Sequence, residues 1–333
     1  MKIDTGIGAN LAAVPARSLA AEQAGLDCLW AAETTNDPFL SLVLAAEHSE
    51  RVSLGTSIAI AFARNPMSLA YTTNQLQEFS SGRLILGLGS QVRAHIERRF
   101  SAEWSRPAAR MREFVLALRA VWASWNEGAP LNFEGEFYTH TLMTPLFTPR
   151  PHEFGAPRVF VAAVGEGMTE VAGEVADGVI THGFSSPRYL REITLPALQR
   201  GLEKSGRSRA DIEVTCPGFI TVVTNDEQEA KARAAMRQQL AFYGSTPAYR
   251  PVLDLHGWGE LQPELYLSSK RGDWEEMAKL INDEIVDTLS IITAPDSLAA
   301  EIRRRYGGVA DRINVAWWRK AWWPPVGEKL RSL

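Results

Sequence analysis

The sequence SLGTSIAIAFARNPMSLAYTTNQLQEFSSGRLILGLGS (residues 53–90) contains two apolar runs with a helix signal between them. The runs, 52–60 and 84–89, consist mainly of aliphatic and small residues, which is typical of buried strands. Between them, the pair Asn65-Pro66 predicts the start of a helix and Gly82 predicts its end. The stretch therefore predicts one strand–helix–strand unit of a parallel sheet.

The same alternation continues on both sides of this unit. Apolar strand signals followed by helical periods recur along the chain, and the helices again tend to begin at Asp-Pro or Ser-Pro and to end at glycine. The predicted strands are 2–8, 28–32, 52–60, 84–89, 158–165, 177–183, 212–223 and 311–318. Eight such units predict an α/β fold of the (β/α)₈ TIM-barrel type. A doubly wound sheet is the alternative, although it usually has fewer units.

The chain is longer than a barrel of this type requires. A typical (β/α)₈ barrel uses about 250 residues, whereas this chain has 333. We expect the additional residues to form insertions near 131–156 and 245–285. Because no segment has the polar composition of a flexible linker, residues 1–333 are predicted to form a single domain.

Composition excludes several classes of partner. The net charge of −4 gives no basic face for nucleic acid. No apolar run approaches the roughly 18 residues of a membrane span, and the N-terminal residues do not resemble a signal peptide. Cys28 and Cys216 are too few for a disulfide framework and lack metal-site spacing. A cytoplasmic protein that binds a small-molecule substrate is expected.

In a TIM barrel the chemistry takes place at the carboxyl ends of the strands. The predicted strand ends deliver small and polar residues there. These candidates are Glu33, Ser57, Ile58, Gly89, Ser90, Gln91, His95, Val164, Gly165, Glu166, Gly167, Thr181 and His182. Glu33 and His95 are equally compatible with solvated surface positions, and a lone histidine such as His182 is often a packing residue.

Two glycine segments among these candidates suggest ligand contacts. GLGSQV (87–92) lacks the third glycine of GxGxxG and lies in the fourth unit, which disfavours a nicotinamide fingerprint. Its glycines would instead allow a flat ligand to approach the backbone, or would allow close packing of strand and helix. AVGEGMTEV (163–171) is the better phosphate candidate, because its glycines precede a helix with free amides; an ordinary tight turn is the alternative. No GxSxG, HExxH or paired-histidine motif indicates a hydrolase or a metal site.

The stretch 53–90, with its LGT, RNP and LQEFSSGRLILGLGS elements, resembles the luciferase-like monooxygenase superfamily. GLDCLWAAET (25–34) and EVADGVITHGF (174–184) match it further along, so the resemblance spans nearly the whole chain. Within the superfamily, GTSIAI (55–60) and GSQVRAHIERRF (89–100) are similar to the coenzyme F420-dependent oxidoreductase branch. The resemblance implies a luciferase-like TIM barrel with a deazaflavin or flavin ring across the strand ends.

The resemblance also implies roles for individual residues. A non-proline cis peptide between Ser57 and Ile58 would back the ring, and Glu33 would meet the ring edge. Gly89 and Ser90 would pass under the cofactor tail, and the turn from Gly165 to Gly167 would hold its phosphate. The other candidates for cofactor binding are Gln91, Val164, Thr181 and His182. His95 stands where relatives often carry Asn, which is a departure from the pattern.

The implied reaction is hydride transfer between coenzyme F420 and an unidentified small organic substrate. Glu33 and His95 are the candidates for proton handling near the ring. Segment 59–65 and the insertion near 245–285 would wall the substrate. The alternatives are an FMN-dependent monooxygenase of the same fold and a non-catalytic F420-binding paralogue. Basic residues at the rim would suit the polyglutamate tail of F420, or would simply be solvated; they are Arg64, Arg93, Arg98 and Arg99.

A homodimer is expected, as is usual for the family. The helical segments 38–49 and 65–76 carry more apolar surface than the outer ring of a monomeric barrel needs. Packing under the chain's own insertions is the alternative use of this surface. The tryptophan-rich segment 317–323 is predicted to serve packing or a subunit contact.

Overall fold

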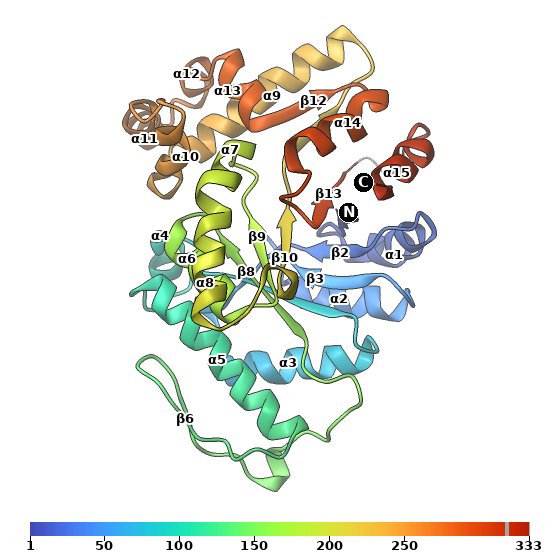
Figure 1. Ribbon diagram of the computed structural model, residues 1–333, viewed down its shortest axis with the longest axis vertical. Coiled ribbons are helices and arrows are strands. Elements are labelled where there is room, and N and C mark those ends of the chain that lie inside the picture. Colours follow the sequence, from blue (N-terminus) through green and yellow to red (C-terminus); the bar gives the residue numbers. More distant parts are fainter. Residues whose placement is uncertain (317–319, 333) are drawn as a thin grey trace.

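A closed barrel of eight parallel strands lies at the centre of the computed structural model, which describes residues 1–316 and 320–332 (Figure 1). The strands follow the order β3-β2-β1-β13-β10-β9-β8-β5, and β3 pairs with β5 to close the ring. They are β1 (Lys2–Gly6), β2 (Cys28–Ala31), β3 (Ser53–Thr56) with its continuation β4 (Ala59–Ile60), β5 (Leu84–Gly89), β8 (Arg158–Ala163), β9 (Gly178–Thr181), β10 (Glu213–Cys216) and β13 (Arg312–Asn314). The predicted TIM barrel is confirmed.

Helices surround this barrel, and their termini follow the predicted signals. They are α1 (Val14–Gln23), α2 (Pro38–Glu47), α3 (Pro66–Phe79), α4 (Arg93–Arg98), α5 (Pro107–Asn126), α6 (Glu166–Val175), α7 (Pro187–Tyr189), a π turn (Leu190–Thr194), α8 (Leu195–Lys204), α14 (Pro295–Tyr306) and α15 (Trp323–Arg331). The side chains of Asp37 and Asn65 accept hydrogen bonds from the first turns of α2 and α3 and so cap them. None of the helices in the described residues is long and apolar enough to cross a membrane.

Side chains fill the inside of the barrel, so it is a packed core rather than a pore. The interior cluster consists of Cys28, Trp30, Ile85, Phe160 and Ile180, all buried. The rings of Trp30 and Phe160 each pack against a glycine on a neighbouring strand, where a larger residue would clash. A Cβ on Gly55 would lie 2.3 Å from the Trp30 ring, and a Cβ on Gly178 would lie 2.5 Å from the Phe160 ring.

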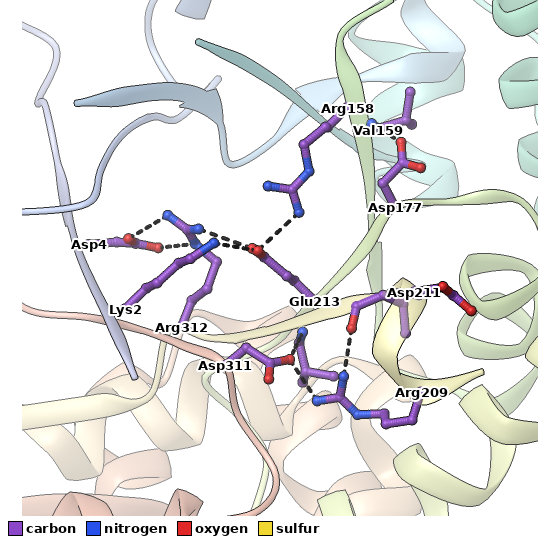
Figure 2. Close-up of polar contacts among 12 residues, drawn as sticks. Lys2, Asp4, Arg158, Val159, Asp177, Arg209, Asp211, Glu213, Asp311 and Arg312 are labelled. Carbon is purple, nitrogen blue, oxygen red and sulfur yellow. Dashed lines mark hydrogen bonds and ion pairs between the residues drawn. The ribbon is translucent and has the colours of Figure 1, made fainter. Parts of the chain in front are cut away.

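A buried ion pair joins β1 to β13 near the amino-terminal ends of the strands (Figure 2). Arg312 donates to both carboxylate oxygens of Asp4 at 2.8 Å, and Trp30 Nε1 donates to the same carboxylate at 2.9 Å. Asp4 is 0% exposed and Arg312 1%. Burial alone would lower the pKa of Arg312, but the charge of Asp4, its hydrogen bond and the charge of Glu213 together outweigh burial and raise that pKa.

Glu213 extends this network towards the surface (Figure 2). Its carboxylate pairs with Arg312 at 3.0 Å, Arg158 at 3.2 Å and Lys2 at 2.5 Å. Burial would raise the pKa of Glu213, but the hydrogen bond from Lys2 and the charges of the two arginines lower it to about 2. Because these groups lie at the face opposite the strand carboxyl ends, they stabilise the barrel rather than act in chemistry.

The first predicted insertion forms an arm outside the barrel. Residues 131–156 contain the antiparallel pair β6 (Phe133–Glu134) and β7 (Thr139–His140), followed by the short helix η3 (Pro145–Phe147). The Tyr71 hydroxyl on α3 donates a hydrogen bond to the Phe147 carbonyl oxygen, which fixes the arm against that helix. The position near 131–156 agrees with the prediction.

The second insertion is larger than predicted, and the prediction of one strand over 212–223 is wrong. The chain leaves the barrel after β10, at Pro217 and Gly218, where Gly218 has a φ of +55°. An outer segment, residues 219–293, then forms before the chain returns. It contains β11 (Phe219–Val222), α9 (Asp226–Gly244), η6 (Pro247–Tyr249), α10 (Arg250–Leu255), α11 (Leu261–Arg271), α12 (Trp274–Lys279), α13 (Asp283–Leu289) and β12 (Ser290–Thr293).

The outer segment has a hydrophobic core of its own. Its strands β11 and β12 pair in parallel, separate from the barrel sheet. Helix α9 packs against α11, α12 and α13 rather than serving as the seventh barrel helix, a place taken by α14 (Figure 1). The core includes Met236, Leu240, Val252, Leu253, Leu265, Met277, Ile285, Val286 and Leu289. The insertion therefore begins at 219 rather than 245, because α9 belongs to it.

The last barrel strand is shorter than predicted. It ends at Asn314 rather than at 318. Residues 317–319, which include the end of the predicted strand and the start of the tryptophan-rich segment, lie outside the described residues. Within that segment, Trp323 is buried, and the Trp322 ring packs edge-on against it at 6.5 Å. For these two tryptophans the packing interpretation is confirmed.

Candidate functional site

A bulge interrupts the third barrel strand at its carboxyl end. The peptide bond between Ser57 and Ile58 is cis, as predicted. The neighbouring strand β5 passes this bulge closely: a Cβ on Gly87 would lie 1.9 Å from the Thr56 carbonyl oxygen, and one on Gly89 would lie 2.7 Å from the Ile58 side chain. Both glycines are thus required for packing of one strand against the next. The sequence had suggested ligand approach or packing of a strand against a helix, and neither of these is strand–strand packing. A cofactor contact at Gly89 stays a prediction.

Glu33, in the loop after strand β2, holds the bulge in place. One of its carboxylate oxygens accepts hydrogen bonds from the Ile60 amide at 2.7 Å and from Arg64 Nη1 at 2.6 Å, and the Glu33 amide donates to the Ile58 carbonyl at 3.3 Å. Arg64 also pairs with Asp37 at 3.0 Å. Arg64 is therefore an ion-pair partner inside the site rather than a free basic residue of the rim. Proton handling by Glu33 stays a prediction.

The turn before α6 forms an open cradle, defined here by Gly165, Glu166 and Gly167. Gly165 is the N-cap with an ordinary φ of −85°, and no described residue accepts hydrogen bonds from the first amides of the helix. A Cβ on Gly165 would meet nothing within 4 Å, and one on Gly167 only the Ala108 Cβ at 3.9 Å. Neither packing nor conformation explains glycine at 165, whereas a phosphate approaching free amides does.

The side chains around the cradle point to other partners. The Glu166 carboxylate pairs with Arg200 on α8 at 2.6 Å, which offsets its negative charge near the cradle and leaves its backbone amide to interact with an anion. The carbonyl of Val164 accepts a hydrogen bond from the Tyr189 hydroxyl at 3.2 Å, which fixes the strand end. Sequence reasoning missed Tyr189, since nothing local connects it to this turn. The residues present fit the phosphate of a flavin or deazaflavin.

The carboxyl end of β5 forms a tight turn towards α4. Gln91 has a φ of +59°, its side-chain oxygen accepts from the Val92 amide, and its carbonyl accepts from the Ser90 hydroxyl. His95 lies exposed on α4. Its side chain makes no hydrogen bond with the described residues, and the structure does not bring it into contact with Glu33. Its role in proton handling stays a prediction.

The predicted basic rim is only partly free. Arg93 pairs with Glu97 at 2.8 Å, and Arg99 donates to the Thr34 carbonyl at 2.8 Å. Arg98 is exposed on α4, and none of its contacts within the described residues is an ion pair. No group of acidic, histidine or cysteine residues suited to a metal ion occurs within 1–316 or 320–332.

The carboxyl end of β9 presents an aromatic cluster. The Thr181 hydroxyl donates to the Thr215 carbonyl inside the barrel at 3.2 Å, so it serves the sheet. His182, the next residue, stacks on Tyr249 with ring centroids 4.7 Å apart and meets the Tyr243 ring edge-on at 4.6 Å. Neither tyrosine was predicted, because both come from the outer segment. That the insertion near 245–285 walls the substrate stays a prediction, as does a cofactor contact by Thr181 or His182.

The chain matches known proteins over nearly its full length. The profile of luciferase-like monooxygenases matches residues 2–312. An uncharacterised protein of Mycobacterium tuberculosis is 54% identical over 313 residues, covering 94% of this chain and 92% of the relative. A second protein of that organism, whose name assigns it provisionally as a coenzyme F420-dependent oxidoreductase, is 30% identical over 290 residues, which cover 82% of this chain and 81% of the relative.

A solved structure agrees with the fold. The coenzyme F420-dependent tetrahydromethanopterin reductase of Methanopyrus kandleri superposes with a TM-score of 0.78, covering 99% of this chain and 96% of that one. The two sequences are 21% identical. This likeness confirms the luciferase-like barrel architecture.

Proposed function

This chain belongs to the luciferase-like monooxygenase family, and we propose that within it the protein is a coenzyme F420-dependent oxidoreductase acting on a small organic substrate. The open cradle at Gly165 carries the proposal, because it is a glycine position that a bound phosphate explains and the fold does not. The similarity to a protein named as F420-dependent supports the deazaflavin over FMN. An FMN-dependent monooxygenase is the alternative, since FMN also carries a phosphate.

The residues divide into those that bind and those that position. The amides of Glu166 and Gly167 would hold the cofactor phosphate. Glu33, through Ile60 and Arg64, keeps the bulge at Ser57 and Ile58 rigid. When bound, the deazaflavin supplies a carbon that accepts or gives a hydride, and the protein supplies orientation. His95 is proposed for proton handling at the rim.

Cofactor preference tests the proposal. In parallel fluorescence titrations with F420 and with FMN, we expect at least tenfold tighter binding of F420. A preference for FMN would replace the proposal with the monooxygenase alternative. Tight F420 binding combined with no hydride exchange between F420 and any of a panel of alcohols, ketones and enones would favour the non-catalytic paralogue.

We also propose a homodimer formed through α2 and α3. Large apolar side chains on these helices are exposed, and the arm bound to α3 adds more, which is unusual for a monomer's surface. They are Leu40, Val43, Tyr71, Phe79, Leu142, Leu146 and Phe147. The site itself comes from one chain, so cofactor binding should not require the partner.

Light scattering at low micromolar concentration should give about twice the monomer mass of 36.8 kDa. Leu40→Arg, at a position 58% exposed in one chain, should shift the protein to the monomer by placing a charge in the apolar face. Leu267→Arg on α11, which is also 58% exposed but lies outside α2 and α3, is the matched control. A monomeric mass for the unaltered protein would contradict the dimer and leave the cofactor proposal intact.

A further inference from the structure

His182 lies at the end of a barrel strand and contacts aromatic residues of the outer segment. It follows β9, and the register of Thr181 opposite Ala163 places it beside Val164, the residue before the cradle. Three rings surround the imidazole: Tyr249 stacked, and Tyr243 and Phe219 edge-on at 4.6 and 6.3 Å. All are half-buried rather than enclosed. They form an aromatic patch at the carboxyl end of the barrel, where substrates bind in this architecture.

The tautomer of His182 is determined by the backbone. Its Nδ1 lies 2.9 Å from the Phe184 amide nitrogen and accepts a hydrogen bond from it, so the proton of the neutral ring is on Nε2. No described residue accepts a hydrogen bond from Nε2. The imidazole is half-buried, so within the described residues this N–H is left as a donor for a ligand.

The patch is uncharged. Burial lowers the pKa of His182 to about 4, and no charged group contributes to the shift. Burial likewise raises the pKa of Tyr249 to about 12. At neutral pH the patch thus offers aromatic surface and a neutral N–H donor, and no charged group of the described residues contributes to the pKa shift of His182. A charged ligand group placed here would lose hydration without compensation.

We propose that His182 is a substrate-binding residue: its Nε2–H donates a hydrogen bond to an acceptor on the substrate, and together with Tyr243 and Tyr249 it selects flat, uncharged compounds such as aryl ketones or aldehydes. The inference deepens the proposed function, on which it rests for the reaction itself. The hydrogen bond orients the carbonyl, and the rings exclude water from it.

Binding of four matched probes to the cofactor-free protein tests this selection. The probes are acetophenone, ethylbenzene, benzoate and 1-phenylethylammonium, which share one ring and differ in acceptor and charge. By titration followed with ligand-observed NMR, acetophenone should bind about fivefold more tightly than ethylbenzene, as expected for one hydrogen bond. The two charged probes should bind more weakly than either.

Variants separate the donor from the rings. His182→Phe keeps an aromatic ring but removes the donor, so acetophenone should fall to the affinity of ethylbenzene while ethylbenzene is unchanged. Tyr249→Leu should weaken both neutral probes by a similar factor. Tyr266→Leu on α11, a tyrosine outside the patch, is the matched control and should change neither. Thermal unfolding curves identify any variant that fails to fold.

A further measurement does not depend on a variant. In ¹⁵N spectra of the unaltered protein, Nδ1 of His182 should remain unprotonated from pH 5.5 to 8. A protonated Nδ1 in this range, equal affinity for acetophenone and ethylbenzene, or tighter binding of a charged probe would overturn the proposal. Because these experiments use no cofactor, their failure is distinguishable from loss of F420 binding, which would contradict the proposed function instead.

Discussion

Replacing Arg312 with alanine is expected to lower the free energy of unfolding by about 3–5 kcal/mol, the usual cost of removing one partner of a buried ion pair. Arg312 makes two hydrogen bonds to Asp4, and both side chains are excluded from solvent. The substitution leaves the Asp4 carboxylate in the barrel with only Trp30 as a donor. Urea denaturation followed by tryptophan fluorescence measures the change.

Two controls make this prediction specific. Arg158→Met removes an arginine that also contacts Glu213 but is 42% exposed on its side chain, so it should cost less than about 1 kcal/mol. The double variant Asp4→Ala, Arg312→Ala should cost less than the sum of the two single variants, because the second change removes the isolated charge. Equal effects of Arg312→Ala and Arg158→Met would contradict the importance of burial.

Gly165→Val is expected to weaken F420 binding by about 100-fold, or roughly 2.7 kcal/mol, without changing stability. The added side chain would occupy the space over the cradle, where the phosphate must approach the amides. Because no protein atom lies within 4 Å of the added Cβ, the substitution causes no clash, and the unfolding temperature should not change. A fluorescence titration and a thermal unfolding curve on the same sample measure both quantities.

A graded series strengthens the test. Gly165→Ala, with a single methyl group, should give an intermediate affinity, since it fills less of the cradle. Unchanged F420 affinity in Gly165→Val, with an unchanged unfolding temperature, would remove the cradle from the cofactor site. A large loss of stability would instead mean that the glycine serves the fold.

Local signals predict the barrel well because each of its units is specified within a short stretch. Asn65 and Asp37 cap their helices through hydrogen bonds to residues two positions away. The strand 212–223 was predicted wrongly because apolar residues lie on both sides of Pro217 and Gly218. The break there depends on β12, which pairs with β11 from about seventy residues further along the chain.

The candidate site divides in the same way. Gly165 and Gly167 were identifiable because strand, glycines and helix are contiguous in the sequence. The partners of His182 were not, because Tyr243 and Tyr249 reach it from the end of α9 and from η6. The packing role of Gly89 was also hidden, since it depends on a contact with Ile58 on the neighbouring strand. Sequence patterns locate strand ends but not the side chains that fold over them.

The outer segment leaves and rejoins the barrel through two strands that lie side by side, with Phe219 opposite Ser290. The barrel strands on either side of it, β10 and β13, pair directly with each other. The ring of strands therefore closes without this segment, whose length and sequence can change while the eight strands stay paired. Tyr243 and Tyr249 thus belong to a part of the chain that has its own core, separate from the packing of the cradle.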